Sequence, residues 1–64
     1  MFKLTHPEHP VEMEQISARR YVVRECGSDI RITTKDRASD MYRTLVAKHE
    51  LMEQRFHNAY QQEN

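Results

Sequence analysis

A second cysteine is missing from this chain of 64 residues, since Cys26 stands alone and no intrachain disulfide can form. A domain of this size buries only about 60% of the surface that its unfolded chain exposes, so its own core gives marginal stability. Small domains without disulfides are usually completed by a metal or by another chain. We therefore expect self-association or a tightly bound partner. A single free thiol also fits a reducing compartment.

Net charge and long hydrophobic runs are missing as well. Ten Lys and Arg residues balance ten Asp and Glu residues, so the chain has no global positive excess to attract nucleic acid non-specifically. No stretch approaches the roughly 18 apolar residues of a membrane span, and the first residues contain no signal-peptide core. We expect a cytoplasmic protein that does not use the membrane. The 38% hydrophobic content is enough to predict a folded chain.

The positions of proline and glycine between the segments of the sequence predict one small α+β domain over residues 1–64. Residues 1–17 form an extended lead, 18–35 a β-hairpin and 36–61 a long helix. In the lead, Pro7 and Pro10 exclude a helix around them. Residues 11–16 alternate apolar and acidic side chains as a third strand would, although Pro10 can also begin a short helix. We favour the strand.

The hairpin is predicted from two runs of β-branched and aromatic residues, 21–26 and 29–34. Gly27 and Ser28 between them fit a two-residue type II′ turn, which needs glycine first. This register places Arg24 opposite Arg31. One face of the hairpin then carries Tyr21, Val23, Ile30 and Ile32, and the other carries Arg20, Val22, Arg24, Arg31 and Thr33.

The helix of residues 36–61 contains no Gly or Pro and can be capped by Thr34 or Asp36. At about 1.5 Å per residue it is about 39 Å long, and a two-stranded hairpin cannot cover that length. The stretch from Met41 to Leu45 can pack on the hairpin, whereas the rest of the apolar stripe needs a second copy or a partner. The predicted dimer interface consists of Leu45, His49, Met52, Phe56 and Tyr60.

The basic residues of the hairpin predict a second binding surface. Arg24 directly opposite Arg31 is unfavourable unless an anion or an acidic partner lies across them. The alternative is a solvated face over which Glu12 and Glu14 close. The predicted partner-binding residues are Arg20, Arg24, Arg31 and Lys35.

Three motifs resemble chemical sites but are incomplete. The helix segment that begins at His49 has the outline of a zinc-protease motif without its second histidine. A ladder of His49, Glu53 and His57 can hold zinc on paper, but His57 lies about 80° from the apolar stripe at 100° per residue. His6 and His9 flank Glu8, yet Pro7 and Pro10 stiffen this segment as a surface lead.

We therefore expect no catalytic residue, no metal and no cofactor, and hence no enzyme. The composition and the two predicted surfaces favour a small regulatory or inhibitory protein that forms a homo-oligomer and binds another protein. The alternative is a nucleic-acid-binding regulator that uses the hairpin arginines.

Overall fold

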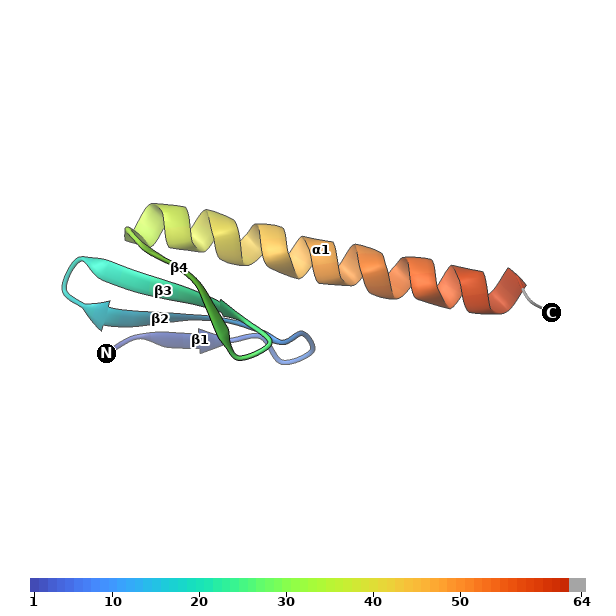
Figure 1. The fold of residues 1–64 in the computed structure, drawn as a ribbon, viewed down its shortest axis with the longest axis horizontal. Coiled ribbons are helices and arrows are strands. Elements are labelled where there is room, and N and C mark those ends of the chain that lie inside the picture. Colours follow the sequence, from blue (N-terminus) through green and yellow to red (C-terminus); the bar gives the residue numbers. More distant parts are fainter. Residues whose placement is uncertain (63–64) are drawn as a thin grey trace.

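The fold is a four-stranded antiparallel sheet with one long helix across one face, as the computed structural model in Figure 1 shows. The structure describes the backbone of residues 1–62 and the side chains of residues 1–57. The strands follow one another in the order β1-β2-β3-β4, which confirms the α+β class but gives more strands than the predicted hairpin. The elements are β1 (Lys3–Thr5), β2 (Val11–Ser17), β3 (Arg20–Glu25), β4 (Ser28–Thr33) and α1 (Lys35–Gln62).

The first two strands come from the predicted lead. The alternation of residues 11–16 does form a strand, β2, and β1 pairs with it so that Leu4 lies opposite Met13. Both prolines lie in the connecting loop, where neither has to donate to the sheet. Backbone bonds tie this loop down, since Cys26 N–H donates to Pro10 O at 2.8 Å. The lead is therefore part of the sheet.

The turn between β3 and β4 differs from the prediction by one residue. Cys26 and Gly27 have φ values of 54° and 82°, so they are the two loop residues, and two positive φ values define a type I′ turn. Gly27 therefore takes the second position and not the first. A bulge at Ile30 then shifts the register again, so that Arg24 lies opposite Asp29 and Val23 opposite Arg31. The predicted pairing of Arg24 with Arg31 is wrong.

This register changes which side chains meet the helix. Ile32 lies opposite Val22, on the face of the sheet away from Val23 and Tyr21. Ile30 and Ile32 remain 44% and 49% exposed, so the prediction that they share one buried hairpin face with Tyr21 and Val23 is wrong.

Met13 on β2 fills the core position instead. It forms one buried cluster with Tyr21, Val23 and Ala38. Met41, Tyr42 and Leu45 of α1 pack against this cluster at helical spacing. The core therefore lies between β2, β3 and the first half of the helix.

The helix is longer than the sheet that it covers. Its 28 residues span about 42 Å at 1.5 Å per residue, whereas the seven residues of β2 span about 23 Å. Every described side chain from Glu50 to His57 is exposed, and Met52 and Phe56 are 52% and 76% exposed. The described residues form no helix whose length and hydropathy would allow it to span a lipid bilayer.

We predict that Met13→Ala lowers the free energy of unfolding by about 2 to 5 kcal/mol, because it removes a buried side chain and leaves a cavity. A domain of this size has only about 3 to 10 kcal/mol in total. Urea unfolding followed by circular dichroism measures the change. The matched control, Leu51→Ala, removes a 48% exposed side chain and should change the value by less than about 0.5 kcal/mol. Equal losses in both variants would contradict this position of the core.

Candidate protein-binding surfaces

Arg24 is surrounded by carboxylates from the strands on both sides of it. Its Nη1 donates to Glu14 at 2.7 Å and to Glu12 at 3.1 Å, and its Nε donates to Asp29 at 2.7 Å. Lys3 on β1 adds a cation 3.6 Å from Glu12. The alternative interpretation, in which Glu12 and Glu14 close over this face, is confirmed at Arg24. The charge of this arginine is therefore neutralised within the chain.

The ion pairs stabilise the ionised form of the carboxylates. The hydrogen bond from Arg24 holds the pKa of Glu14 below its ordinary value of 4.5. On the opposite face, hydrogen bonds from Lys48 and then from His49 lower the pKa of Glu25. A lowered folded pKa stabilises the fold above the unfolded value, and this contribution is lost as the pH falls through the folded value.

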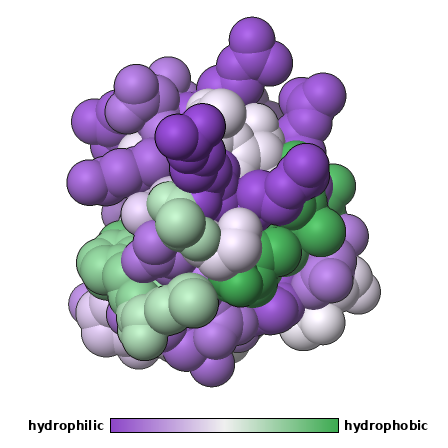
Figure 2. Space-filling view, turned by 90° about the vertical axis from the view of Figure 1, so that its left-hand side faces the viewer, coloured by the Kyte–Doolittle hydropathy of each residue, from purple (hydrophilic) through white to green (hydrophobic). Residues whose placement is uncertain are grey.

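Four other cations gather at one end of the molecule. Arg19 lies in the β2–β3 turn and Arg20 is the first residue of β3, and Lys35 and Arg37 begin the helix next to them, because Tyr21 lies opposite Thr33 in the sheet. All four are exposed, and none makes a side-chain hydrogen bond or ion pair with the described residues. We call these four residues the basic end. Figure 2 views the molecule from this end, where hydrophilic surface dominates and the apolar areas lie lower, over the sheet.

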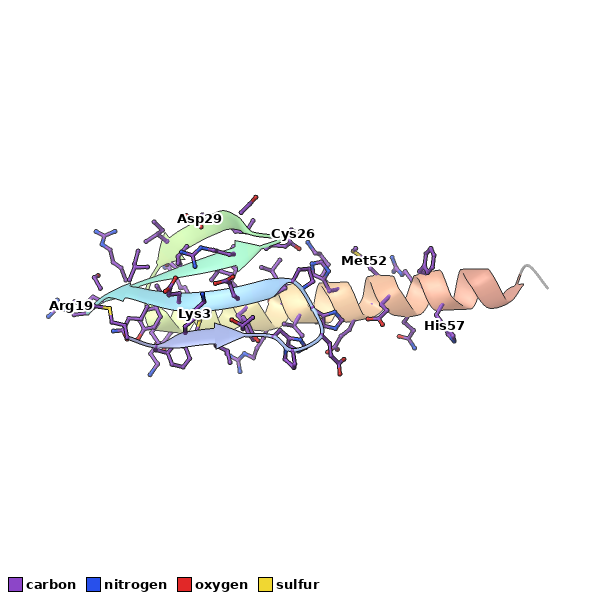
Figure 3. The ribbon with its side chains drawn as sticks, turned by 90° about the horizontal axis from the view of Figure 1, so that it is seen from below. Lys3, Arg19, Cys26, Asp29, Met52 and His57 are labelled. Atoms are coloured by element: carbon purple, nitrogen blue, oxygen red, sulfur yellow. The ribbon has the colours of Figure 1, made fainter. Side chains whose placement is uncertain are left out.

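Of the predicted partner-binding residues, Arg20 and Lys35 belong to the basic end. Arg31 lies farther along β4, opposite Val23, and is also exposed without an ion pair to the described residues. Arg24 is set apart from them by its carboxylates. Figure 3 shows Arg19 at one end of the sheet and Cys26 at the other. No signal in the sequence separates Arg24 from its neighbours, because its partners come from β2 and β4 and depend on the register.

A row of histidines joins the β1–β2 loop to the helix. The rings of His6 and His9 stack at 4.9 Å between centroids, and His9 stacks on His49 at 6.0 Å. His6 Nδ1 accepts the backbone N–H groups of Glu8 and His9 at 3.1 Å each. His9 is only 8% exposed, so the interpretation of this segment as a surface lead is wrong at His9, although Pro7, Glu8 and Pro10 are exposed.

His49 is fixed from the sheet side. Its Nε2 lies 2.6 Å from Oε2 of Glu25, to which it donates a hydrogen bond, and Lys48 reaches the same oxygen at 2.7 Å. Tyr42 lies two turns before His49 on the same helix face, and burial raises the pKa of its phenol. His9, His49 and Glu25 thus lie at the edge of the core, at the point where the sheet ends.

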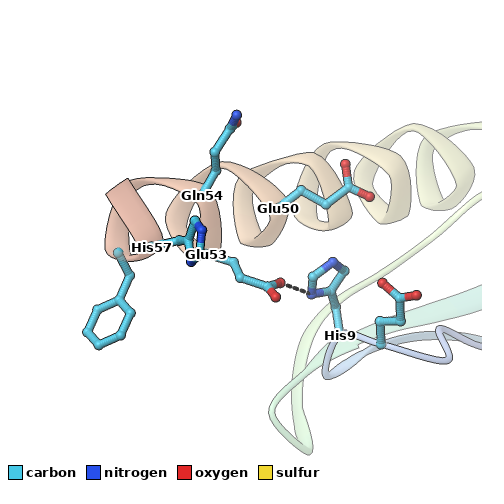
Figure 4. A pocket seen from close by; sticks show the side chains of 7 residues that line it. His9, Glu50, Glu53, Gln54 and His57 are labelled. Carbon is cyan, nitrogen blue, oxygen red and sulfur yellow. Dashed lines mark ion pairs between the residues drawn. The ribbon is translucent and has the colours of Figure 1, made fainter. Parts of the chain in front are cut away.

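A groove of about 710 Å³ begins beyond this junction, between the β1–β2 loop and the exposed half of α1. Figure 4 shows His9 and Glu53 facing each other across it, with the ring nitrogen 3.8 Å from the carboxylate. The lining residues are Glu8 and His9 on the loop, and Glu50, Glu53, Gln54, Phe56 and His57 on the helix.

The residues of the suggested zinc ladder have other neighbours. His49 contacts Glu25, whereas Glu53 faces His9. Within the part of the chain that the structure describes, no group of three or more His, Cys, Asp or Glu side chains is arranged to hold a metal ion. The described side chains thus give the groove an extended lining of mixed polarity.

The predicted interface residues divide into two groups. Leu45 packs against the core of its own chain, and His49 binds Glu25 of its own chain. Met52 and Phe56 are exposed beyond the sheet. The side chain of Tyr60 lies outside the described residues. The surface available to another molecule thus begins after His49.

In comparisons with known proteins, no protein-family profile, no curated protein sequence and no solved structure matches this chain.

We predict that Arg24→Gln lowers the urea midpoint at neutral pH and weakens its dependence on pH. Without the arginine, Glu12, Glu14 and Asp29 repel one another, so acid relieves this repulsion and no longer breaks an ion pair. Urea midpoints at about pH 7 and about pH 3 measure this, and the wild type should lose more stability than the variant.

The control for this prediction is Arg43→Gln. Arg43 pairs only with Asp40 among the described residues, and both side chains are 74% exposed, so the pair adds little. Its pH profile should follow that of the wild type. Parallel profiles for Arg24→Gln and the wild type would contradict a stabilising role for the cluster.

Proposed function

We propose that this chain is a small non-enzymatic regulatory or inhibitory protein that forms a homo-oligomer and acts by binding another protein. The observation that carries the proposal is the continuation of the apolar helix face past the end of the sheet. Met52 and Phe56 lie three and seven residues after His49, so they extend the face that packs on the core. A half-exposed methionine beside a three-quarters exposed phenylalanine is typical of an interface that another chain covers.

The basic end supports binding of an acidic target. Unpaired arginines and lysines attract a complementary surface, speed its encounter and select against basic partners. Arg19 lies in a tight turn and Arg20 begins β3, so little backbone order has to be gained when they bind. Lys35 and Arg37 add charge from the helix. Arg31 extends this surface along β4. The partner in this proposal is therefore a protein with an acidic patch.

The pairing of the titratable side chains supports binding over catalysis. His49 donates to Glu25, His9 faces Glu53, and His6 accepts two backbone N–H groups. A general base needs a lone pair directed at a substrate. These histidines instead hold the loop against the helix.

A nucleic-acid-binding regulator is the second candidate, and one observation favours it. Phe2 is 47% exposed and its carbonyl accepts the N–H of Gln15, which places this aromatic residue at the end of the sheet nearest the basic end. Bases stack on such rings beside cations that contact phosphate. Tyr21 is buried, however, so it cannot extend this platform. The protein-binding function is therefore the better supported of the two.

We predict that Arg19→Gln combined with Arg20→Gln weakens binding of the protein target about tenfold or more, since it removes charge from the contact surface. The measurement is capture from a nuclease-treated lysate of the native host, followed by titration of the captured protein. The control, Arg43→Gln, removes a charge from the outer face of the covered half of the helix and should bind normally. A target that both variants bind equally well would show that the basic end is only solvated surface.

The same variants test the second candidate. Labelled duplex DNA and single-stranded RNA are titrated with the wild type at several salt concentrations. Tight binding that falls steeply with salt, and that the basic-end variant loses, would replace the protein-binding function with nucleic-acid recognition.

A further inference from the structure

Imidazole rings join the β1–β2 loop, residues 6–10, to α1. His6 and His9 lie on this loop, and their rings stack at 4.9 Å between centroids. His9 stacks in turn on His49 of the helix at 6.0 Å, and its side chain is only 6% exposed. We call these three residues the histidine row. The loop therefore meets the helix through rings that can each gain a proton.

His6 holds the turn of the loop with one ring nitrogen. Its Nδ1 accepts the backbone N–H groups of Glu8 and His9 at 3.1 Å each. A nitrogen that accepts a hydrogen bond carries no proton, so these contacts assign the proton of the neutral ring to Nε2. A proton added at Nδ1 would turn this acceptor into a donor that faces two other donors. Protonation of His6 is therefore incompatible with the closed loop.

His49, at the helix end of the row, has a counter-charge on the sheet. Its Nε2 lies 2.6 Å from Oε2 of Glu25 on β3. Lys48 reaches the same oxygen at 2.7 Å, and the hydrogen bonds from Lys48 and then from His49 lower the pKa of Glu25. A charge on His49 is therefore stabilised where it stands. The row can hold one proton at its helix end without a change in the loop.

The loop end of the row has less support. His9 faces Glu53 at 3.8 Å (Figure 4), but that carboxylate is 74% exposed, so water screens its attraction. His6 makes no ion pair with a described side chain, and Glu8 of the loop lines the groove. The ring beside His6, that of Tyr42 at 6.4 Å, stays uncharged because burial raises the pKa of the phenol. Charges on neighbouring rings of the row repel one another, and burial strengthens the repulsion. Further protons therefore act against the closed loop.

We propose that the histidine row is a proton-operated latch, closed at neutral pH, in which protonation of His6 releases the β1–β2 loop from α1 in mild acid. Imidazoles take up protons between about pH 8 and pH 5. The carboxylates that bind the sheet together protonate lower, because hydrogen bonds hold the pKa of Glu14 and of Glu25 below the ordinary value of 4.5. The buried core cluster contains no imidazole or carboxyl group. The sheet thus stays folded in the range in which the latch opens.

Release of the loop changes the groove. Glu8 and His9 form its wall on the loop, opposite the helix side chains that include Glu53. When the loop leaves α1, His9 becomes exposed and this wall is lost. A molecule held in the groove at neutral pH is therefore released in mild acid. The inference goes beyond the proposed function, since the latch works within one chain and needs neither a target nor a second copy.

Hydrogen exchange at the two amides that bind His6 tests the latch. An exposed imidazole has a pKa of about 6.5, and an opening that takes up one proton becomes up to about tenfold more frequent per pH unit. The protection factors of the Glu8 and His9 amides should therefore fall about tenfold between about pH 7.5 and about pH 5.5. NMR-detected exchange, corrected for intrinsic rates, measures them. The amides of β3, in the middle of the sheet, should keep their protection.

Two variants of His6 separate the proton from the hydrogen bonds. In His6→Asn the side-chain oxygen can accept the same two N–H groups but does not titrate, so protection should match the wild type at about pH 7.5 and stay level to about pH 5.5. His6→Ala removes the acceptor, so both amides should be poorly protected at every pH. The control, His57→Asn, removes an exposed imidazole outside the row and should keep the pH dependence of the wild type.

A nitrogen NMR spectrum of isotope-labelled histidine rings gives a readout on the wild type alone. His6 should carry its proton on Nε2 at about pH 7.5, and the midpoint of its protonation should coincide with the loss of amide protection. Two results would overturn the latch: a ring midpoint apart from the loss of protection, or equal pH dependence in the wild type and in His6→Asn. Parallel loss of protection in β3 would also overturn it, because the acid would then unfold the whole domain and not the loop.

Discussion

The helix is longer than the sheet that it covers, and this difference in length is the constraint on which the rest of the structure depends. Met13, Tyr21 and Val23 bury only the first half of the apolar helix face, up to Leu45. A row of histidines then closes the core, and beyond it the apolar face continues without a layer beneath it. A chain of 64 residues has little excess stability, so a second chain that covered this face would both stabilise the fold and define an assembly.

The charged residues are also distributed unevenly along the length of the molecule. The middle of the sheet is neutralised internally, because Arg24 is shared among carboxylates on both neighbouring strands. The basic end keeps its charge unpaired among the described residues, whereas Glu8, Glu50 and Glu53 line the groove at the far side. A net charge of zero thus conceals two ends of opposite sign. Long-range attraction of an acidic partner depends on this local separation and not on the total charge.

Local patterns predicted most elements but not how they meet. The helix was predictable from its stripe and from the lack of Gly and Pro, and β2 from its alternation. The register was not, because Gly27 fits either position of a two-residue turn and the bulge at Ile30 leaves no sequence signal. The burial of His9 depends on its contact with His49 of the helix, far along the chain, which no local rule contains. The partners of Arg24 likewise depend on the register, so the candidate surface could be predicted only in part.

Self-association of the wild type is the central claim, and sedimentation equilibrium tests it most directly. At micromolar concentration near neutral pH, we expect a single species of twice the 7.7 kDa chain mass, with a folded circular dichroism spectrum. Dilution should shift the mass downward and lower the thermal midpoint in parallel, because assembly and stability are coupled. A folded species that keeps the mass of one chain at every concentration would contradict the claim.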